Sequence, residues 1–281
     1  MRRPAVLALA LLLALASGAA AAAERIVALG GVVTETVHAL GRGAELVGVD
    51  RTSLYPAEVQ ALPKVGYVRT LAAEGILSLR PTLILASADA GPLSTIEQLE
   101  RSGVRMVRLP EATEAAAAPR LIRTIAAALD RKAEGEELAG RLDRDLSSLA
   151  AERAVRPPGP KVLFVLGIGS GPPMVAGSHT AAEGIITLAG GRNAISGFEG
   201  YKPLSPEAAL VAAPDLILTT DQSLAQLGGA PALLARPELA GTPAARAGRV
   251  ASFDALYLLG FGPRTADAAL ALAKVMAEGP P

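Results

Sequence analysis

A long charged stretch near the middle of the chain constrains its fold most, because it separates two regions of a different character. In "RKAEGEELAGRLDRDLSSLAAERAVRPPGP", residues 131–160, four leucines recur at helical spacing: Leu138, Leu142, Leu146 and Leu149. Leucines on one face and charges elsewhere predict an amphipathic helix, which the prolines from Pro157 onward end. A helix over 133–155 is on the order of 33 Å long. Such a rigid strut predicts two lobes that move little relative to each other.

Short apolar runs alternate with helical patterns on both sides of this stretch. The first region contains the apolar runs "RIVALG", "ELVGVD", "TLILAS" and "RMVRLP", with the helical patterns "TETVHALG" and "TIEQLERSG" between them. The second contains "KVLFVLG", "DLILTT" and "GRVASFD", with "TAAEGIITLAGG", "PALLARPEL" and "TADAALALAKVMAEG". This alternation is typical of parallel strands joined by crossover helices. We therefore expect an α/β protein, with two α/β lobes joined by a single long interdomain helix and a ligand cleft between the lobes.

The N-terminus predicts export. "MRRPAVLALALLLALASGAAAAAER" has a basic start, an apolar run over 5–16 and small residues at cleavage positions, which indicates a secretory signal peptide. The apolar run is shorter than the roughly 20 residues of a membrane-spanning helix. With no cysteine, the chain carries neither disulfides nor a lipid-anchoring thiol. We expect a signal peptide over 1–23, cleaved after Ala21 or Ala23, and a mature periplasmic protein that is not inserted in the membrane.

The remainder divides into three parts on the same reasoning. We assign an N-terminal α/β lobe to 24–130, a linking helix to 131–156 and a C-terminal α/β lobe to 157–281. Removing the signal peptide takes two arginines from 27 basic residues and none from 27 acidic ones, so 25 − 27 leaves a net charge of −2. A nucleic-acid partner requires a basic surface, so this charge disfavours it.

A weak internal repeat links the two lobes. Residues 71–85, "LAAEGILSLRPTLIL", match 204–218, "LSPEAALVAAPDLIL", at seven of fifteen positions with an offset of 133. The preceding Gly66-Tyr67 recurs as Gly200-Tyr201, one residue out of step. Shared helix-to-strand patterning explains part of this match. We expect each lobe to present a tyrosine-bearing loop, then a short helix, then a strand, with the two loops facing each other.

Enzyme motifs and conventional metal ligands are poorly represented. The glycine-rich "LGIGSGPP" has Pro172 where a dinucleotide fingerprint needs glycine, and Ile168 breaks a nucleophile elbow at Ser170. The two histidines, His38 and His179, have no partner at metal-ligand spacing. We interpret both as structural or solvent-exposed, and we expect no catalytic residues and no enzymatic reaction.

Tyr67 is the remaining candidate for ligand binding, in a chain with four Tyr, four Phe and no Trp. In "PKVGYVRTLAAEG", Arg69 follows it by two residues, and in an extended stretch residues i and i+2 lie on the same side. A cationic donor and a ferric ion both favour phenolate, and tyrosine is an axial ligand of haem iron in some proteins. A turn tyrosine that packs on its neighbours, beside a solvated Arg69, explains the same residues.

Two longer segments carry a family resemblance. "VGYVRTLAAEGILSLRP" and "PMVAGSHTAAEGIITLAGGRNAISGFEGYKPLSPEAALVAAPDLIL" resemble the periplasmic haem-binding proteins of bacterial haem-uptake ABC transporters, which are class III substrate-binding proteins. The resemblance implies that ferric haem (ferric protoporphyrin IX) is the transported ligand, with Tyr67 as the axial iron ligand and Arg69 hydrogen-bonded to it. Some relatives add a histidine near "VLFVLGIG", where this chain has Gly167, so the resemblance implies a site with tyrosine alone. It also implies delivery to an inner-membrane ABC permease dimer with its ATPase subunits.

The rest of the predicted site comes from both lobes. Tyr201, Lys202 and Phe198 lie in the matching segment of the second lobe, and Arg51 and Tyr55 follow the second predicted strand. We expect them to flank the porphyrin, with Lys202 and Arg51 as propionate anchors because charged donors give stronger hydrogen bonds to carboxylates. Ordinary loop solvation is the alternative for each.

Two glutamates fall in register across the repeat. Glu74 and Glu207 are 133 residues apart, and Glu207 follows Ser205 and Pro206 in an arrangement typical of a helix start. Helix capping explains Glu207 without any partner. The resemblance implies instead that one glutamate per lobe docks onto arginines of the permease.

Two alternatives stay open, together with the expectation of a monomer. The same fold binds a ferric siderophore or a corrinoid in the first alternative, although such sites are usually richer in aromatic residues or arginines. In the second, the chain is a periplasmic enzyme acting on a haem-like substrate, which the lack of an acid-base or nucleophile constellation disfavours.

Overall fold

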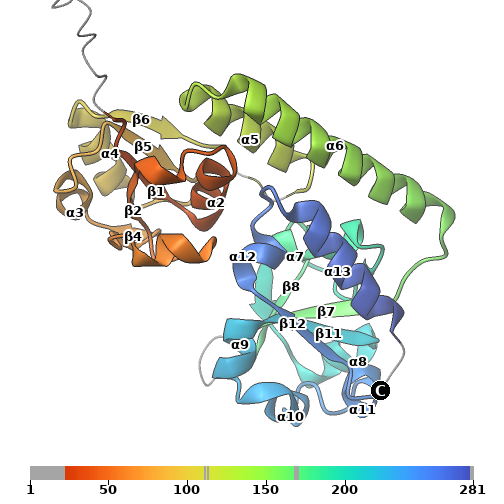
Figure 1. Cartoon of the computed structure of the whole chain (residues 1–281). Helices are drawn as coiled ribbons and strands as arrows, with labels where there is room; N and C mark the ends of the chain where they lie inside the picture. The colour runs from red at the N-terminus through yellow and green to blue at the C-terminus, as the bar shows by residue number, and fades with distance from the viewer. Residues whose placement is uncertain (1–22, 111, 113, 168–170, 279–281) are drawn as a thin grey trace, which may run out of the picture.

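The computed structural model describes residues 23–278 except 111, 113 and 168–170. Two α/β lobes lie on either side of an interlobe contact, and helix α6 (Lys132–Val155) runs along both (Figure 1). The predicted fold class is confirmed, and the helix expected over 133–155 is α6. The predicted signal peptide lies almost entirely outside the described residues. Over the ranges that are described, no helix is both long and apolar enough to cross a membrane.

The N-terminal lobe is built on a parallel sheet in the order β2-β1-β5-β6. Its strands are the four apolar runs of the sequence: β1 (Ile26–Leu29), β2 (Leu46–Val49), β5 (Leu83–Ala86) and β6 (Arg105–Arg108). Every residue of β1 and β5 is buried, as expected for a parallel sheet covered on both faces. One face packs against α2 (Gly31–Ala39) and α5 (Ala117–Ala128), and the other against α3 (Ala73–Leu77) and α4 (Leu93–Arg101).

The C-terminal lobe has a six-stranded mixed sheet. The order is β10-β8-β7-β11-β12, and β9 pairs with β7. Its strands are β7 (Lys161–Leu166), β8 (Met174–Ala176), β9 (Arg192–Asn193), β10 (Tyr201–Pro203), β11 (Leu216–Thr220) and β12 (Val250–Phe253). The three predicted strands are β7, β11 and β12, which are parallel, whereas β8 and β10 add antiparallel pairs at one edge.

Helices cover both faces of this second sheet. Phe164 of β7 faces a core shared with α7 (Ala181–Leu188), α12 (Ala255–Leu259) and α13 (Thr265–Ala277). The opposite core contains α8 (Pro206–Ala212), α10 (Gly229–Leu234) and α11 (Pro243–Arg246), with α9 (Asp221–Gln226) at its margin. The sheet therefore forms the middle of a three-layer lobe.

The connection between the lobes is a pair of helices, because α5 packs along α6 (Figure 1). Arg123 of α5 donates hydrogen bonds to Glu136 and Asp143 of α6, at 2.8–2.9 Å. A Cβ added at Gly135 of α6 would lie 2.1 Å from the Cβ of Ala126, so only glycine allows this close approach. Side chains of α5 enter the cores of both lobes. The strut predicted as one helix is thus stiffened by a second.

Candidate functional site

Tyr67 lies in a small hairpin formed by β3 (Gly66–Tyr67) and β4 (Thr70–Leu71), which pairs with neither main sheet. Backbone hydrogen bonds from Arg51 to Gly66 and between Val68 and Gly91, all 2.8 Å, fix the hairpin to the N-terminal lobe. Val68 is buried in the lobe core, whereas its neighbour Tyr67 is 44% exposed. Val68 and Arg69 form the turn between the two strands, so the buried Val68 anchors this turn on the lobe while the Tyr67 side chain stays at the surface.

Arg69 pairs with an acidic side chain in this structure. Its Nε atom lies 3.3 Å from Oδ2 of Asp89, and both side chains are exposed. Within the described part of the chain no hydrogen bond joins Arg69 to Tyr67, so the hydrogen bond expected between them stays a prediction. An exposed ion pair contributes about 0–1 kcal/mol. Arg69 can therefore leave Asp89 for a stronger acceptor at little cost.

The loop after β2 is ordered by a buried carboxylate that the sequence reasoning missed. Asp50 is completely buried, and its oxygens accept four hydrogen bonds of 2.6–2.8 Å, from the backbone N–H groups of Gly30 and Thr52 and from the hydroxyls of Thr52 and Ser53. An acidic residue at the end of the apolar run "ELVGVD" was the available signal. This network fixes the loop that carries the predicted residues Arg51 and Tyr55, both exposed.

Tyr55 contacts an arginine of the other lobe, which was also missed. The Cζ atom of Arg264 lies 3.6 Å from the centroid of the Tyr55 ring and 5.0 Å from that of Tyr257. Nε and Nη2 of Arg264 donate to the two carboxylate oxygens of Glu35 in α2, each at 2.8 Å. Burial by itself lowers the pKa of Arg264, but the hydrogen bond and charge of Glu35 outweigh it and raise that pKa above its usual value. A charged arginine thus joins the two lobes beside Tyr55.

Tyr201 occupies a sheet strand, where a loop was expected. It begins β10 and pairs with Ala176 of β8. Its ring meets Phe164 edge to face, with centroids 6.4 Å apart and planes at 69°. Burial raises the pKa of the Tyr201 phenol above its ordinary value. This environment favours the neutral phenol, which is suited to packing and hydrogen bonding and poorly suited to ligating a metal.

Lys202 and Phe198 lie together, as their predicted grouping implies. The Nζ atom of Lys202 is 4.9 Å from the centroid of the Phe198 ring. The carbonyl oxygen of Phe198 accepts hydrogen bonds from Ser178 N–H at 2.9 Å and from its hydroxyl at 3.0 Å. Lys202 itself is exposed, so its ammonium can reach an anionic ligand group.

Glu74 and Glu207 occupy matching positions in the first turns of α3 and α8, and both are exposed. The pKa of Glu207 is lowered, first by a hydrogen bond to its own backbone N–H and then by one with Ser205. The Ser205 hydroxyl also accepts from the N–H of Ala208. Ser205 is thus the N-cap of α8 and Glu207 bonds to it in the first turn, whereas α3 has no side-chain cap at Ala72.

The two histidines are exposed side chains of the surface. His38 lies at the end of α2, and His179 precedes α7 with Nδ1 3.3 Å from Oε1 of Glu199. This agrees with their interpretation as exposed or structural residues. Among the residues that the structure covers, no three His, Cys, Asp or Glu side chains gather as metal ligands would.

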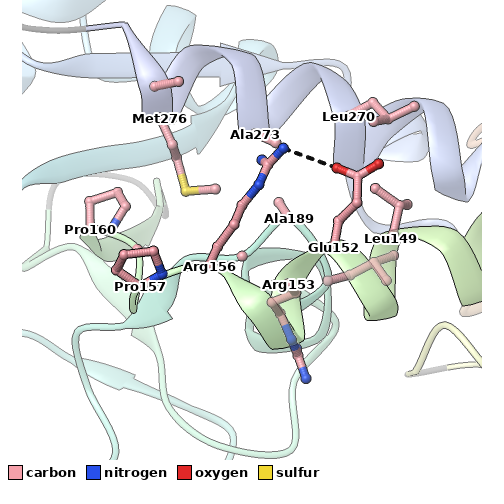
Figure 2. A pocket seen from close by; sticks show the side chains of 14 residues that line it. Leu149, Glu152, Arg153, Arg156, Pro157, Pro160, Ala189, Leu270, Ala273 and Met276 are labelled. Carbon is pink, nitrogen blue, oxygen red and sulfur yellow. Dashed lines mark hydrogen bonds and ion pairs between the residues drawn. The ribbon is translucent and has the colours of Figure 1, made fainter.

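A groove of about 180 Å³ lies at the C-terminal end of α6 and α13, apart from all of these residues (Figure 2). Apolar side chains such as Leu149 and Met276 line it together with two arginines. Arg156 pairs with Glu152 at 3.1 Å, and Arg153 donates to the carbonyl oxygen of Thr187 at 2.8 Å. Because these cations already have partners and no aromatic residue lines the groove, its chemistry does not resemble that around Tyr67.

Comparison with known proteins places the chain among transport proteins of one fold. A family model described as periplasmic binding protein matches residues 26–257. The structure of the periplasmic heme-binding protein BhuT in complex with two hemes is 46% identical, with a TM-score of 0.85 over 90% of this chain and 97% of that one. The periplasmic heme-binding protein RhuT from Roseiflexus sp. RS-1, in apo form, is 40% identical with a TM-score of 0.87, over 90% and 98%.

Relatives with another ligand in their names also match. The vitamin B12-binding protein of Yersinia pseudotuberculosis serotype O:1b (strain IP 31758) is 31% identical over 193 residues. The match covers 66% of this chain and 65% of that relative's length.

Proposed function

This chain belongs to the periplasmic binding protein family, and we propose that it captures ferric haem through Tyr67 and delivers it to an inner-membrane ABC importer. The observation that carries the proposal is the outward-facing phenol of Tyr67, on a hairpin held rigidly by the N-terminal lobe. The likeness to haem-binding proteins over nearly their whole length supports it. The protein acts in the periplasm, as a monomer, and performs no reaction.

Tyr67 supplies the iron ligand in this proposal. Ferric iron is a hard Lewis acid, and its charge stabilises the phenolate. Arg69 leaves Asp89, to which it is bound only by an exposed pair at 3.3 Å, and donates to the phenolate oxygen. A charged donor strengthens that hydrogen bond and favours the ionised ligand.

The remaining predicted residues form walls around the ring. Tyr55 and Arg51 contribute from the loop fixed by Asp50, and Lys202 with Phe198 contributes from the other lobe. Lys202 and Arg51 are exposed cations suited to the haem propionates. Tyr201, whose ring packs edge to face against Phe164, offers a contact surface on this wall.

A corrinoid is the second candidate ligand, since relatives with 31% identity are named for vitamin B12. The two ligands differ at the metal: haem leaves an axial position open to a phenolate, whereas cobalamin carries bulky groups on both faces of its ring. A ferric siderophore would not need an axial protein ligand at all.

Parallel titrations separate these ligands. Purified mature protein is titrated with hemin, cyanocobalamin and a ferric siderophore, and binding is followed by absorption and calorimetry. We expect hemin to give a saturable shift of its absorption bands, and cyanocobalamin and the ferric siderophore to give no measurable heat of binding. Saturable binding of cyanocobalamin without a response to hemin would replace haem by a corrinoid as the ligand.

Glu74 and Glu207 are proposed to seat the loaded protein on the permease dimer. Both are exposed and lie at the start of equivalent helices, one in each lobe. Glu74→Ala and Glu207→Ala should leave hemin affinity unchanged and slow uptake into vesicles that contain the reconstituted importer. Glu100→Ala, an exposed position in α4, is the matched control. Uptake equal to wild type in the double variant Glu74→Ala/Glu207→Ala would exclude docking through these residues.

A further inference from the structure

The lobes meet in a closely packed contact between α2 and the segment around 256–264. A Cβ added at Gly31 would lie 2.9 Å from Cδ1 of Leu256, and one added at Gly262 would lie 2.6 Å from Cγ2 of Val32. The contact therefore has no room for one more methyl group at either glycine. This apolar contact and the α5–α6 helix pair, which enters both cores, hold the lobes together, but apolar contacts by themselves are not directional.

A partly buried ion pair between the lobes adds a directional contact. Glu35 of α2 is only 5% exposed, and Arg264, which precedes α13, holds it through two parallel hydrogen bonds of 2.8 Å. A fork of this kind requires the guanidinium and carboxylate planes to align, so it specifies orientation as well as distance. Glu35 and Arg264 come from different lobes, so the pair links the two lobes directly.

The same guanidinium orders two aromatic rings. It lies 3.6 Å from the centre of the Tyr55 ring and 5.0 Å from that of Tyr257. Tyr257 is fixed in turn by a 2.9 Å hydrogen bond from its backbone N–H to Asp254. Tyr55, from the other lobe, keeps 43% of its surface exposed. The Glu35–Arg264 pair thus holds the exposed Tyr55 ring of the N-terminal lobe in a position set by the C-terminal lobe.

We propose that Arg264 is a positioning residue that locks the two lobes in one orientation and presents Tyr55 as a stacking platform for a flat tetrapyrrole. This inference rests on the proposed function and adds a cause for its specificity. A site of fixed width accepts a planar ring and excludes a ring with bulky groups on both faces, because the lobes cannot separate to admit it. Arg264 acts through Tyr55 and through lobe orientation, and the iron is left to Tyr67.

The first test concerns lobe orientation without any ligand. The chain has no cysteine, so Glu100→Cys in one lobe and Ala240→Cys in the other, both exposed, accept spin labels selectively. Double electron–electron resonance should give one narrow distance for the labelled wild type and a broadened distribution for Arg264→Ala and Glu35→Gln. Arg264→Lys keeps the charge without the planar fork, so an intermediate width is expected. Arg141→Ala, which removes an exposed ion pair with Glu137 on α6, is the control.

The second test concerns the ligand. In Arg264→Ala we expect the hemin dissociation constant to rise about tenfold. We also expect saturable binding of cyanocobalamin to appear, because lobes that are no longer locked can separate to admit it. The absorption spectrum of the iron–phenolate complex should not change, since Tyr67 is untouched. A variant that was merely less stable would bind hemin less well and would still not bind cyanocobalamin. Arg264→Lys and Glu35→Gln serve the same purpose if Arg264→Ala does not fold.

The outcomes separate the two proposals. A wild-type protein that does not bind hemin overturns the proposed function, while the spin-label distances still decide whether Arg264 orients the lobes. Distance distributions as narrow as that of wild type in Arg264→Ala and Glu35→Gln would overturn the proposal that this ion pair fixes the orientation of the lobes. Broadened distances with an unchanged preference for hemin overturn its role in specificity.

Discussion

The two tyrosine-bearing segments of the repeat have similar sequences but lie in different environments. Tyr67 and Tyr201 both follow a glycine with positive φ, 116° at Gly66 and 76° at Gly200, and both precede a short helix and a buried strand. Their exposed fractions differ little, 44% against 37%. Their contacts differ more, because Tyr201 packs against Phe164 with its pKa raised by burial.

The cause lies in how each segment pairs. In the C-terminal lobe, β8 and β10 extend the main sheet, so Tyr201 becomes part of an edge strand above the core. In the N-terminal lobe, β3 and β4 pair only with each other, and the hairpin stands apart from the sheet. In the proposed function, the first segment thus provides the phenol that meets the metal, and the second provides a wall of the site. Similar sequence in two lobes does not imply duplicate ligands.

Removing the support of Tyr201 gives the largest expected effect. Phe164 is fully buried in β7, so Phe164→Ala should lower the free energy of unfolding by about 3–5 kcal/mol, measured by urea denaturation. Among the described residues, the core around Phe164 includes none of the hairpin residues 66–71, so the iron–phenolate spectrum should persist in the folded variant. A loss of that spectrum would show that the two segments depend on each other.

Replacing each tyrosine by phenylalanine tests the different roles of Tyr67 and Tyr201 and gives the next largest effect. Tyr67→Phe should raise the hemin dissociation constant by more than about a hundredfold, since loss of outer-shell partners alone costs about 10–100-fold at metal sites. Tyr201→Phe removes one hydroxyl and keeps the ring, so less than about a tenfold rise is expected. Fluorescence or absorption titrations with hemin give both values. Equal losses in the two variants would contradict the comparison.

The neighbours of Tyr67 have a smaller effect. Arg69→Ala should weaken hemin binding by about tenfold, within the range for residues that tune a metal ligand. Asp89 competes for the same guanidinium at 3.3 Å, so Asp89→Ala is expected to leave hemin binding unchanged or tighter. Both variants should change unfolding stability by less than about 1 kcal/mol, because the pair is exposed. Weaker hemin binding in Asp89→Ala would give the carboxylate a direct role.

The pH dependence of Tyr201 is the smallest predicted effect. A phenol with a raised pKa in the folded state binds its proton more tightly than in the unfolded chain, whose tyrosines titrate near the ordinary value of 10.0. The contribution of Tyr201 to the free energy of unfolding is therefore fully present below that pH. It is lost as the pH rises from the unfolded pKa towards the folded pKa. Tyr201→Phe should flatten this fall, measured by thermal unfolding between about pH 9 and pH 11. An identical fall in both proteins would assign it to other groups, such as Tyr257, whose pKa is also raised by burial.

Local patterns in the sequence predicted the parts of the molecule that depend on local forces. The leucine spacing and the prolines gave the long helix, found as Lys132–Val155, and the apolar runs gave seven strands of the two sheets. The other three strands, β8, β9 and β10, were missed because each has only two or three residues and is defined by its pairing with a neighbouring strand. A strand of this length has too few residues to show alternation.

The interlobe contacts were beyond sequence reasoning for a related cause. Glu35 and Arg264 are separated by 229 positions, and neither is marked by a motif. Their pairing is a product of how α2 meets the start of α13, which no local pattern encodes. Tyr55 was selected as a wall residue from its position after a strand, but its arginine neighbour came only with the tertiary structure. Tyr67 was selected because its chemistry is local, two residues from Arg69.

Electron paramagnetic resonance of the ferric hemin complex tests the central claim most directly. Wild type and Tyr201→Phe are each loaded with one equivalent of hemin and compared with Tyr67→Phe by resonance and absorption spectra. If Tyr67 ligates the iron, wild type and Tyr201→Phe share a high-spin ferric signal with a phenolate-to-iron charge-transfer band, and Tyr67→Phe lacks that band. The band persisting in Tyr67→Phe, or disappearing in Tyr201→Phe, would contradict the account.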